Sequence, residues 1–246
     1  MHNGKKWTSE ELSLVLNMYS KMAFGKMHSR NHDIIRLAKH LKRTPGSVAM
    51  KLVNFASIDP QLDRAGLKGC SRLDHQVWEE YFHNEAMIAE SERIMAAVLK
   101  DDDVGATIPE TDFFSENRET MTNARVRQDF FRAAVLSNFN DRCCITGIDR
   151  KELLVASHII PWASDAGNRL NPQNGLCLNA LHDRAFDRGL ITLDDALAVV
   201  VSPRLQRTKR LSLILDYEGL QIAKPEKFMP GGQFLAFHRE NVFLAG

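Results

Sequence analysis

The segment LLVASHIIPW at residues 153–162 and the segment NPQNGLCLNALHDRAFDRGL at residues 171–190 contain the most informative pattern of this chain. The apolar residues before His158 predict a half-buried strand, which Pro161 ends. The second segment opens with residues that are typical of turns, and from Leu176 onward it predicts a helix. The pattern therefore predicts a strand, a loop and a helix in succession.

This order of elements brings a small set of polar side chains together. Asn174 lies sixteen residues after His158, and His182 and Asp183 lie eight and nine residues after Asn174. Because imidazole changes its charge near neutral pH without help from its surroundings, His158 is the candidate general base. A base, a residue that orients it and a ligand for a divalent cation suffice for one-metal phosphodiester hydrolysis. The pattern therefore indicates a nuclease.

At these residues the chain resembles the HNH endonuclease family, whose ββα-metal motif has a histidine at a strand end, an asparagine in a loop and a metal ligand on a helix. The phrases ASHIIPW, NPQNGLCLNALHD and FDRGLIT carry the resemblance, which covers residues 125–240 and points to restriction-type members. It implies that His158 is the general base and that Asn174 pins the loop and orients that base. It also implies that Asp183 is the metal ligand on the helix, with His182 as the competing ligand.

The chain departs from the common family pattern at Ser157, where many members have an aspartate or histidine as a second metal ligand. A serine hydroxyl is a poor ligand for a hard divalent cation. We therefore expect Mg²⁺ or Mn²⁺ to be held at Asp183, His182 or Asp187 beside Ser157, with phosphate and water completing the shell.

Several of these residues also have a structural interpretation. Asn174 is a turn residue as well as a brace for the loop, and we expect both roles. Asp187 fits a structural carboxylate at a helix end better than it fits a metal ligand. Arg184 and Arg188 either bind phosphate or only solvate one face of the helix.

The four cysteines indicate the compartment. Cys143 and Cys144 are adjacent, and with Cys70 and Cys177 they form no four-ligand spacing, so we expect no structural zinc. They also form no disulfide framework, which favours a reducing cytoplasm, and Cys144 and Cys177 are predicted core residues. Because the chain has no signal-peptide core and no run of eighteen apolar residues, we expect no membrane association.

The net charge of +1 conceals a strong asymmetry. Residues 1–58 contain ten basic and three acidic residues, or +7, whereas residues 79–119 contain three basic and twelve acidic residues, or −9. The split predicts a helical DNA-recognition domain at 1–99, an acidic linker at 100–123 and a nuclease domain at 124–246. The alternative is two solvated surfaces that differ by chance.

The basic region predicts three helices. Thr8 and Glu11 form a capping box before the first helix, and Thr44 and Pro45 are suited to the start of the third. The segments KKWTSEEL and RTPGSVAMKLVNF, within residues 5–57, resemble a Myb/SANT or helix-turn-helix module, more weakly than the nuclease pattern resembles its family. Helical spacing puts Ser47, Met50, Lys51 and Asn54 on the face of the third helix opposite its apolar positions, and we expect this face to contact DNA together with Lys42 and Arg43 in the turn before it.

The expected fold class is α+β, with an N-terminal trihelical, helix-turn-helix-like domain and a C-terminal ββα-metal domain. The expected activity is metal-dependent cleavage of double-stranded DNA in restriction or defence, with a homodimer as one way to cut both strands. Two alternatives remain. One is a non-catalytic DNA-binding regulator with a decayed HNH domain, and the other is a nuclease that a protein partner targets through the N-terminal module.

Overall fold

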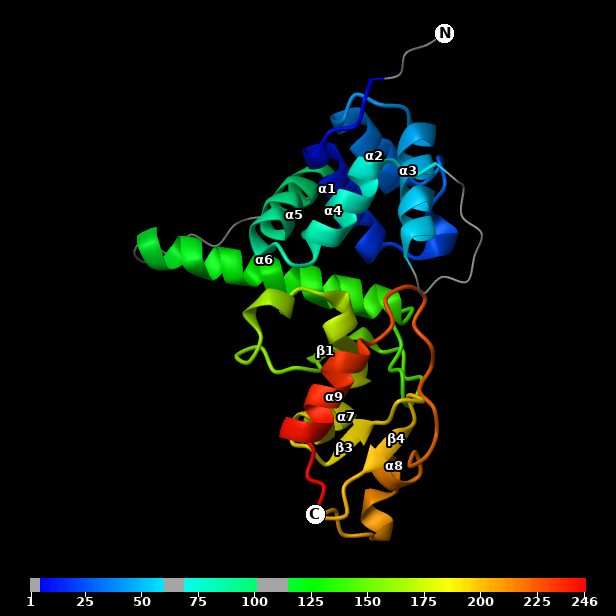
Figure 1. The fold of residues 1–246 in the computed structure, drawn as a ribbon, viewed down its shortest axis with the longest axis vertical. Helices are drawn as coiled ribbons and strands as arrows, with labels where there is room; N and C mark the ends of the chain where they lie inside the picture. The colour runs from blue at the N-terminus through cyan, green and yellow to red at the C-terminus, as the bar shows by residue number, and fades with distance from the viewer. Residues whose placement is uncertain (1–4, 60–68, 101–114) are drawn as a thin grey trace. The chain divides into compact units, whose positions relative to one another are not determined.

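The computed structural model describes residues 5–59, 69–100 and 115–246, and side chains are described outside 115–124. The chain divides into two compact units, Met1–Phe130 and Phe131–Gly246. In the described part of the chain, no helix is both long enough and apolar enough to span a membrane. Figure 1 shows the helical first unit and the mixed second unit.

The predicted linker differs from what the structure describes. Most of it, residues 101–114, lies outside the described residues. Its last part belongs to a long helix, α6 (Ser115–Asn138), and the division between the units falls inside that helix. The second compact unit begins at Phe131, inside the predicted nuclease domain, and the domain bounds stay a prediction.

The first unit contains five helices in its described residues before α6, and the first three of them lie in the basic region. They are α1 (Ser9–Lys21), α2 (His32–His40), α3 (Pro45–Ile58), α4 (Arg72–Tyr81) and α5 (Glu85–Leu99), with a short 3₁₀ turn η1 (Phe24–Lys26). The capping box of Thr8 and Glu11 and the cap at Thr44 followed by Pro45 are confirmed. The helix-turn-helix assignment stays a prediction.

Helices α4 and α5 pack back onto the first three helices. The rings of Tyr19 and Phe55 lie 5.8 and 6.2 Å from the ring of Trp78, and Tyr81 is fully buried. This aromatic core buries large apolar surfaces, which stabilises the unit. Through this packing, α4 covers one face of α3.

The second unit is built around two small antiparallel sheets (Figure 1). In chain order its elements are η2 (Lys151–Leu153), β1 (Leu154–His158), η3 (Ala166–Asn168), η4 (Pro172–Asn174), β2 (Gly175–Asn179), α7 (Ala180–Asp187), β3 (Ile191–Leu193), β4 (Val199–Val201), η5 (Lys209–Leu211), α8 (Ser212–Leu215) and α9 (Gly232–Asn241). Strand β1 pairs with β2, and α7 follows directly, which gives a ββα arrangement. The expectation that the helix starts at Leu176 is wrong, because Leu176 lies in β2 and the helix begins only at Ala180.

The interior of the second unit includes the sulfur-containing residues expected there. Cys144 and Cys177 are buried, as predicted, and all four cysteines are free thiols. Burial raises the pKa of the Cys177 thiol to about 12, so this thiol is protonated at neutral pH. These cysteines therefore act as apolar core residues.

The end of α7 depends on Gly189, which has a φ of +66°. A Cβ atom on Gly189 would lie 2.0 Å from the carbonyl oxygen of Val242, and the Gly189 carbonyl accepts a 3.0 Å bond from Leu244. Gly189→Ala is expected to lower the free energy of unfolding by about 3 kcal/mol, combining left-handed strain with overpacking. Gly219→Ala is the matched control, since Gly219 has a φ of +76° but a Cβ atom on it would meet no other atom within 4 Å. Urea unfolding that shows equal losses in both variants would contradict this account.

Candidate active site

The hairpin of β1 and β2 places His158 at the end of β1, opposite Gly175. A Cβ atom on Gly175 would lie 2.4 Å from Val135 Cγ2 and 2.9 Å from Phe131 Cζ. Glycine is therefore needed for the second half of α6 to pack closely against this sheet. That packing brings Phe131 to the candidate base.

The His158 ring is held in one tautomer. Its Nε2 atom lies 2.9 Å from the carbonyl oxygen of Arg169. Because a carbonyl can only accept, Nε2 carries the proton and Nδ1 of the neutral ring is left as an acceptor. Burial lowers the pKa of His158, and the bond to Arg169 opposes that shift in part. The ring is therefore neutral at pH 7 and able to take a proton at Nδ1.

Two aromatic rings fix the plane of the His158 imidazole. Phe131 stacks on it with ring centroids 3.8 Å apart and an interplanar angle of 9°. Trp162 meets it at 88°, with centroids 5.4 Å apart. Sequence reasoning gave Phe131 no role, since nothing in a helical apolar residue marks it as a neighbour of a base.

Asn174 is buried and ties together the loop that follows β1. Its Oδ1 accepts a 2.8 Å bond from the Ile160 amide, while its Nδ2 donates to the carbonyls of Ile160 and Asn168. Its own carbonyl accepts from the Ile159 amide at 3.0 Å. Asn174 thus makes the contacts that are needed to brace the loop directly after His158.

Helix α7 carries two carboxylates on one face. Asn179 caps the helix by accepting bonds from the amides of Leu181 and His182. Asp183 and Asp187 lie four residues apart, so they occupy successive turns of the same face. Desolvation raises the pKa of both carboxyls, and repulsion from Asp183 raises that of Asp187 further. Binding of a cation would relieve both effects.

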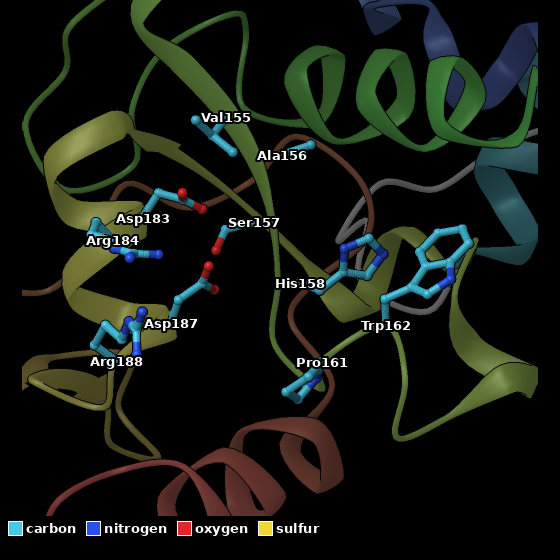
Figure 2. Close-up of a pocket in the computed structure, with 10 residues that line it drawn as sticks. All are labelled: Val155, Ala156, Ser157, His158, Pro161, Trp162, Asp183, Arg184, Asp187 and Arg188. Carbon is cyan, nitrogen blue, oxygen red and sulfur yellow. The ribbon is translucent and has the colours of Figure 1, made fainter. Parts of the chain in front are cut away.

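A cavity of about 480 Å³ joins these groups. Figure 2 shows Asp183 and Asp187 extending from α7 towards Ser157, with the His158 ring on the other side. The lining consists of Val155, Ala156, Ser157, His158, Pro161, Trp162, Asp183, Arg184, Asp187 and Arg188. The ββα arrangement therefore brings the predicted base and the predicted helix-borne ligand to one cavity.

Ser157 contributes a buried hydroxyl to the same wall. It is 2% exposed, and its Oγ has no hydrogen-bond partner with good geometry among the described residues. It lies near enough to Asp183 to oppose the rise in the pKa of that carboxyl. An oxygen left unsatisfied beside two carboxylates is a further oxygen donor facing the cavity.

The donor set fits a hard divalent cation. No group of three or more His, Cys, Asp or Glu residues suited to a metal occurs in the part of the chain that the structure describes. Two carboxylates and a hydroxyl are nonetheless all oxygen donors, and Mg²⁺ typically binds through one or two carboxylates plus substrate phosphate and water. Asp187 makes no ion pair in the described residues, and the choice between a structural carboxylate and a metal ligand stays a prediction.

His182 does not reach this cavity. Its ring is 1% exposed, its Nδ1 lies 3.1 Å from Asn179 Oδ1, and it packs edge-on against Tyr217 at 5.4 Å. Successive residues of a helix point about 100° apart, so Asp183 faces the cavity while His182 faces the interior. The expectation that His182 competes as a metal ligand is corrected accordingly.

Arg184 and Arg188 line the cavity beside the two carboxylates. Both are exposed, and neither forms an ion pair within 4 Å in the described residues. Their positive charge opposes the rise in the pKa of the Asp183 and Asp187 carboxyls, but desolvation has the larger effect on these pKa values. They are positioned to bind a phosphate that enters the cavity.

The structure corrects half of the DNA contacts expected in the first unit. Lys51 is buried and places its Nζ 2.9 Å from both carboxylate oxygens of Asp74 on α4. Asn54 is also buried and donates to the Gly69 carbonyl. The segment that begins at Gly69 covers this face of α3, so neither side chain is available to DNA.

Arg43 is likewise committed inside the unit. Its guanidinium stacks over the Trp7 ring at 3.8 Å, pairs with Glu11 at 2.7 Å and donates to two backbone carbonyls near the N-terminus. Three of the expected contacts remain accessible. Lys42 and Met50 are exposed, and Ser47 is half-buried.

His238 on α9 supports the end of α7 from beneath. It is buried, stacks on Phe186 at 3.7 Å, and donates from Nε2 to the Phe186 carbonyl at 3.1 Å. Its Nδ1 therefore accepts from the Thr192 hydroxyl at 2.9 Å. Because Phe186 directly precedes Asp187, His238 is a positioning residue for the Asp187 carboxylate.

The charge state of His238 predicts a pH dependence of stability. Burial lowers the pKa of His238 to about 4 from 6.5, with bonding to Phe186 opposing the shift. The neutral ring is favoured in the fold, so its contribution is complete above pH 6.5 and is lost as pH falls towards 4. This contribution is about 3 kcal/mol. Urea unfolding between pH 7 and 4 should lose that much less stability in His238→Gln than in the wild type, and parallel curves would contradict the prediction.

Comparison with known proteins bears on the same segment. Residues 143–194 match the model of an HNH endonuclease family, and this range includes β1, β2 and α7 with all the polar cavity residues. No curated protein matches the chain. The similarity to HNH endonucleases thus covers the segment that contains β1, β2 and α7.

Proposed function

We propose that the protein is a metal-dependent endonuclease that hydrolyses DNA phosphodiester bonds. One observation carries the proposal. His158, whose Nδ1 is expected to be unprotonated, lines the same cavity of about 480 Å³ as Asp183 and Asp187 (Figure 2). General-base chemistry and cation binding are thereby available at the same place.

In this mechanism His158 Nδ1 accepts the proton of a water molecule that attacks phosphorus. The bond from Nε2 to the Arg169 carbonyl keeps the ring in the required tautomer and stabilises the charge it gains. Asn174 holds the loop that orients His158. Arg184 and Arg188 bind non-bridging phosphate oxygens, which positions the phosphodiester.

A Mg²⁺ or Mn²⁺ ion held by Asp183 and Asp187, with the Ser157 hydroxyl nearby, would stabilise negative charge on the departing 3′-oxygen. The products would carry 5′-phosphate ends. A single such site cuts one strand, so cleavage of both strands of a duplex requires two sequential nicks or a homodimer.

The test is cleavage of an end-labelled duplex by the purified protein with Mg²⁺, with Mn²⁺ or with EDTA. We expect metal-dependent products whose 5′ ends can be dephosphorylated and relabelled. Intact DNA in every condition, with DNA binding retained, would favour the alternative of a DNA-binding regulator with a decayed HNH domain. Methylated and hydroxymethylated duplexes in parallel test a restriction or defence role, which we propose as the biological setting.

The first unit has two proposed roles. Exposed Lys42, in the turn before α3, and half-buried Ser47, in the first turn of α3, favour a DNA-binding module. Met50, 59% exposed, and Ile35, 42% exposed, favour instead a surface for a protein partner that delivers the nuclease. Lys42→Gln in the full chain lowers the salt dependence of DNA binding under the first role and leaves it unchanged under the second. A cytoplasmic location is proposed from the free cysteines.

A further inference from the structure

A basic segment follows β4 in the second unit. Residues 196–215 contain four basic residues and no acidic residue. All four basic side chains are exposed, and they are Arg204, Arg207, Lys209 and Arg210. The whole unit, residues 131–246, has fourteen basic and twelve acidic residues, a net charge of only +2. The net positive charge of this unit therefore comes from one short stretch, because the rest of the unit has ten basic and twelve acidic residues.

Most of this charge is unneutralised. Arg207 forms a bidentate pair with Glu218, at 2.6 and 2.8 Å. Arg204, Lys209 and Arg210 have no side-chain ion pair or hydrogen bond among the described residues. Three cations within seven residues repel one another unless they meet an anion. The surface is thus complementary to a polyanion.

The basic segment is held against α7, the helix that carries Asp183 and Asp187. In its first half, β4 pairs with β3, and the Ser202 amide donates to the Leu190 carbonyl just after α7. Two residues after the segment, Tyr217 packs edge-on against His182 of α7 at 5.4 Å. In Figure 1 the segment leads from β4 into α8. These two contacts, one just after α7 and one with α7 itself, fix the position of the basic segment relative to Arg184 and Arg188.

We propose that Arg204, Lys209 and Arg210 form a second phosphate-binding surface, which contacts the DNA backbone away from the scissile phosphate. The identity of the polyanion as DNA rests on the proposed function. Contacts of this kind fix the register of the duplex and supply affinity without reading sequence. None of the three residues lines the catalytic cavity, so their contribution lies in binding.

The experiment compares the salt dependence of DNA binding in the full chain. The test variant combines Arg204→Gln, Lys209→Gln and Arg210→Gln. The control variant removes the same charge from another exposed stretch of the unit through Arg142→Gln, Arg150→Gln and Lys151→Gln. Anisotropy of a labelled duplex in EDTA gives log K against log salt. We expect the test variant to flatten the slope by about 2 to 3, at roughly 0.9 per lost phosphate contact, and the control by less than about 1.

A charge-preserving variant and the cleavage assay complete the test. Arg204→Lys with Arg210→Lys is expected to keep the wild-type slope, which links the effect to charge and not to misfolding. Equal slopes in the wild type and the glutamine variant would overturn the surface, whether or not the wild type cleaves DNA. A flattened slope in a protein that never cleaves DNA would support the surface while overturning the proposed nuclease.

Discussion

His158→Ala is expected to slow DNA cleavage about 10²- to 10⁴-fold, the usual effect of removing a general base. The ring supplies the acceptor Nδ1, and no other imidazole lines the cavity in the described residues. Single-turnover cleavage of a labelled duplex in Mn²⁺ measures the rate. Because burial lowers the pKa of His158, the wild-type rate should decline only at a pH below 6.5, its ordinary value.

Controls separate a lost base from a damaged fold. His75→Ala removes an exposed imidazole from α4 and should leave the rate unchanged. Free imidazole should restore part of the rate to His158→Ala, because it can occupy the space the ring leaves. A His158→Ala protein that cleaves at the wild-type rate would refute the assignment of this residue as the base.

Asp183→Asn combined with Asp187→Asn is expected to abolish stabilisation by Mn²⁺ and to lower kcat/KM by at least about 100-fold. Desolvation raises the pKa of both carboxyls, and the negative charge of Asp183 raises the pKa of Asp187 further. Neutral amides remove that cost, so the metal-free variant should be as stable as the wild type or more stable. Thermal unfolding with and without Mn²⁺ tests both parts.

The wild type should gain stability with rising Mn²⁺ concentration, since a ligand that binds only the folded state stabilises it by mass action. Asp194→Asn with Asp195→Asn is a control, because these carboxylates follow β3 and do not line the cavity. Equal Mn²⁺ stabilisation in the wild type and the Asp183/Asp187 variant would place the metal elsewhere.

The sequence predicted the features that depend on local chemistry. The capping residues Thr8 and Thr44 lie where their side chains accept backbone bonds, because a cap depends only on the next three residues. The strand ending at His158 and the helix carrying Asp183 were also within reach of periodicity and spacing. These two residues share one cavity, as the strand–loop–helix order predicted.

The second strand was missed because a five-residue apolar segment has no decisive periodicity. Residues 175–179 fit a buried helix or a buried strand equally well. Pairing with β1, about twenty residues away along the chain, decides in favour of the strand.

The remaining errors concern burial, which depends on distant parts of the chain. Lys51 was expected on an exposed face of α3, yet Asp74, twenty-three residues later, neutralises it in the interior. His182 and Asp183 could not be told apart by spacing, since they are neighbours and only the packing of Tyr217 shows which one faces inward. Contacts of this kind leave no local mark in a sequence.

The most direct test of the central claim is nicking of supercoiled plasmid by the purified wild type and His158→Ala, each with Mn²⁺ and with excess EDTA. A catalytic base beside a cation site predicts nicked plasmid only for the wild type with Mn²⁺. Nicking that persists in EDTA, or that is equal in the two proteins, would contradict a metal-dependent nuclease in which His158 is the base.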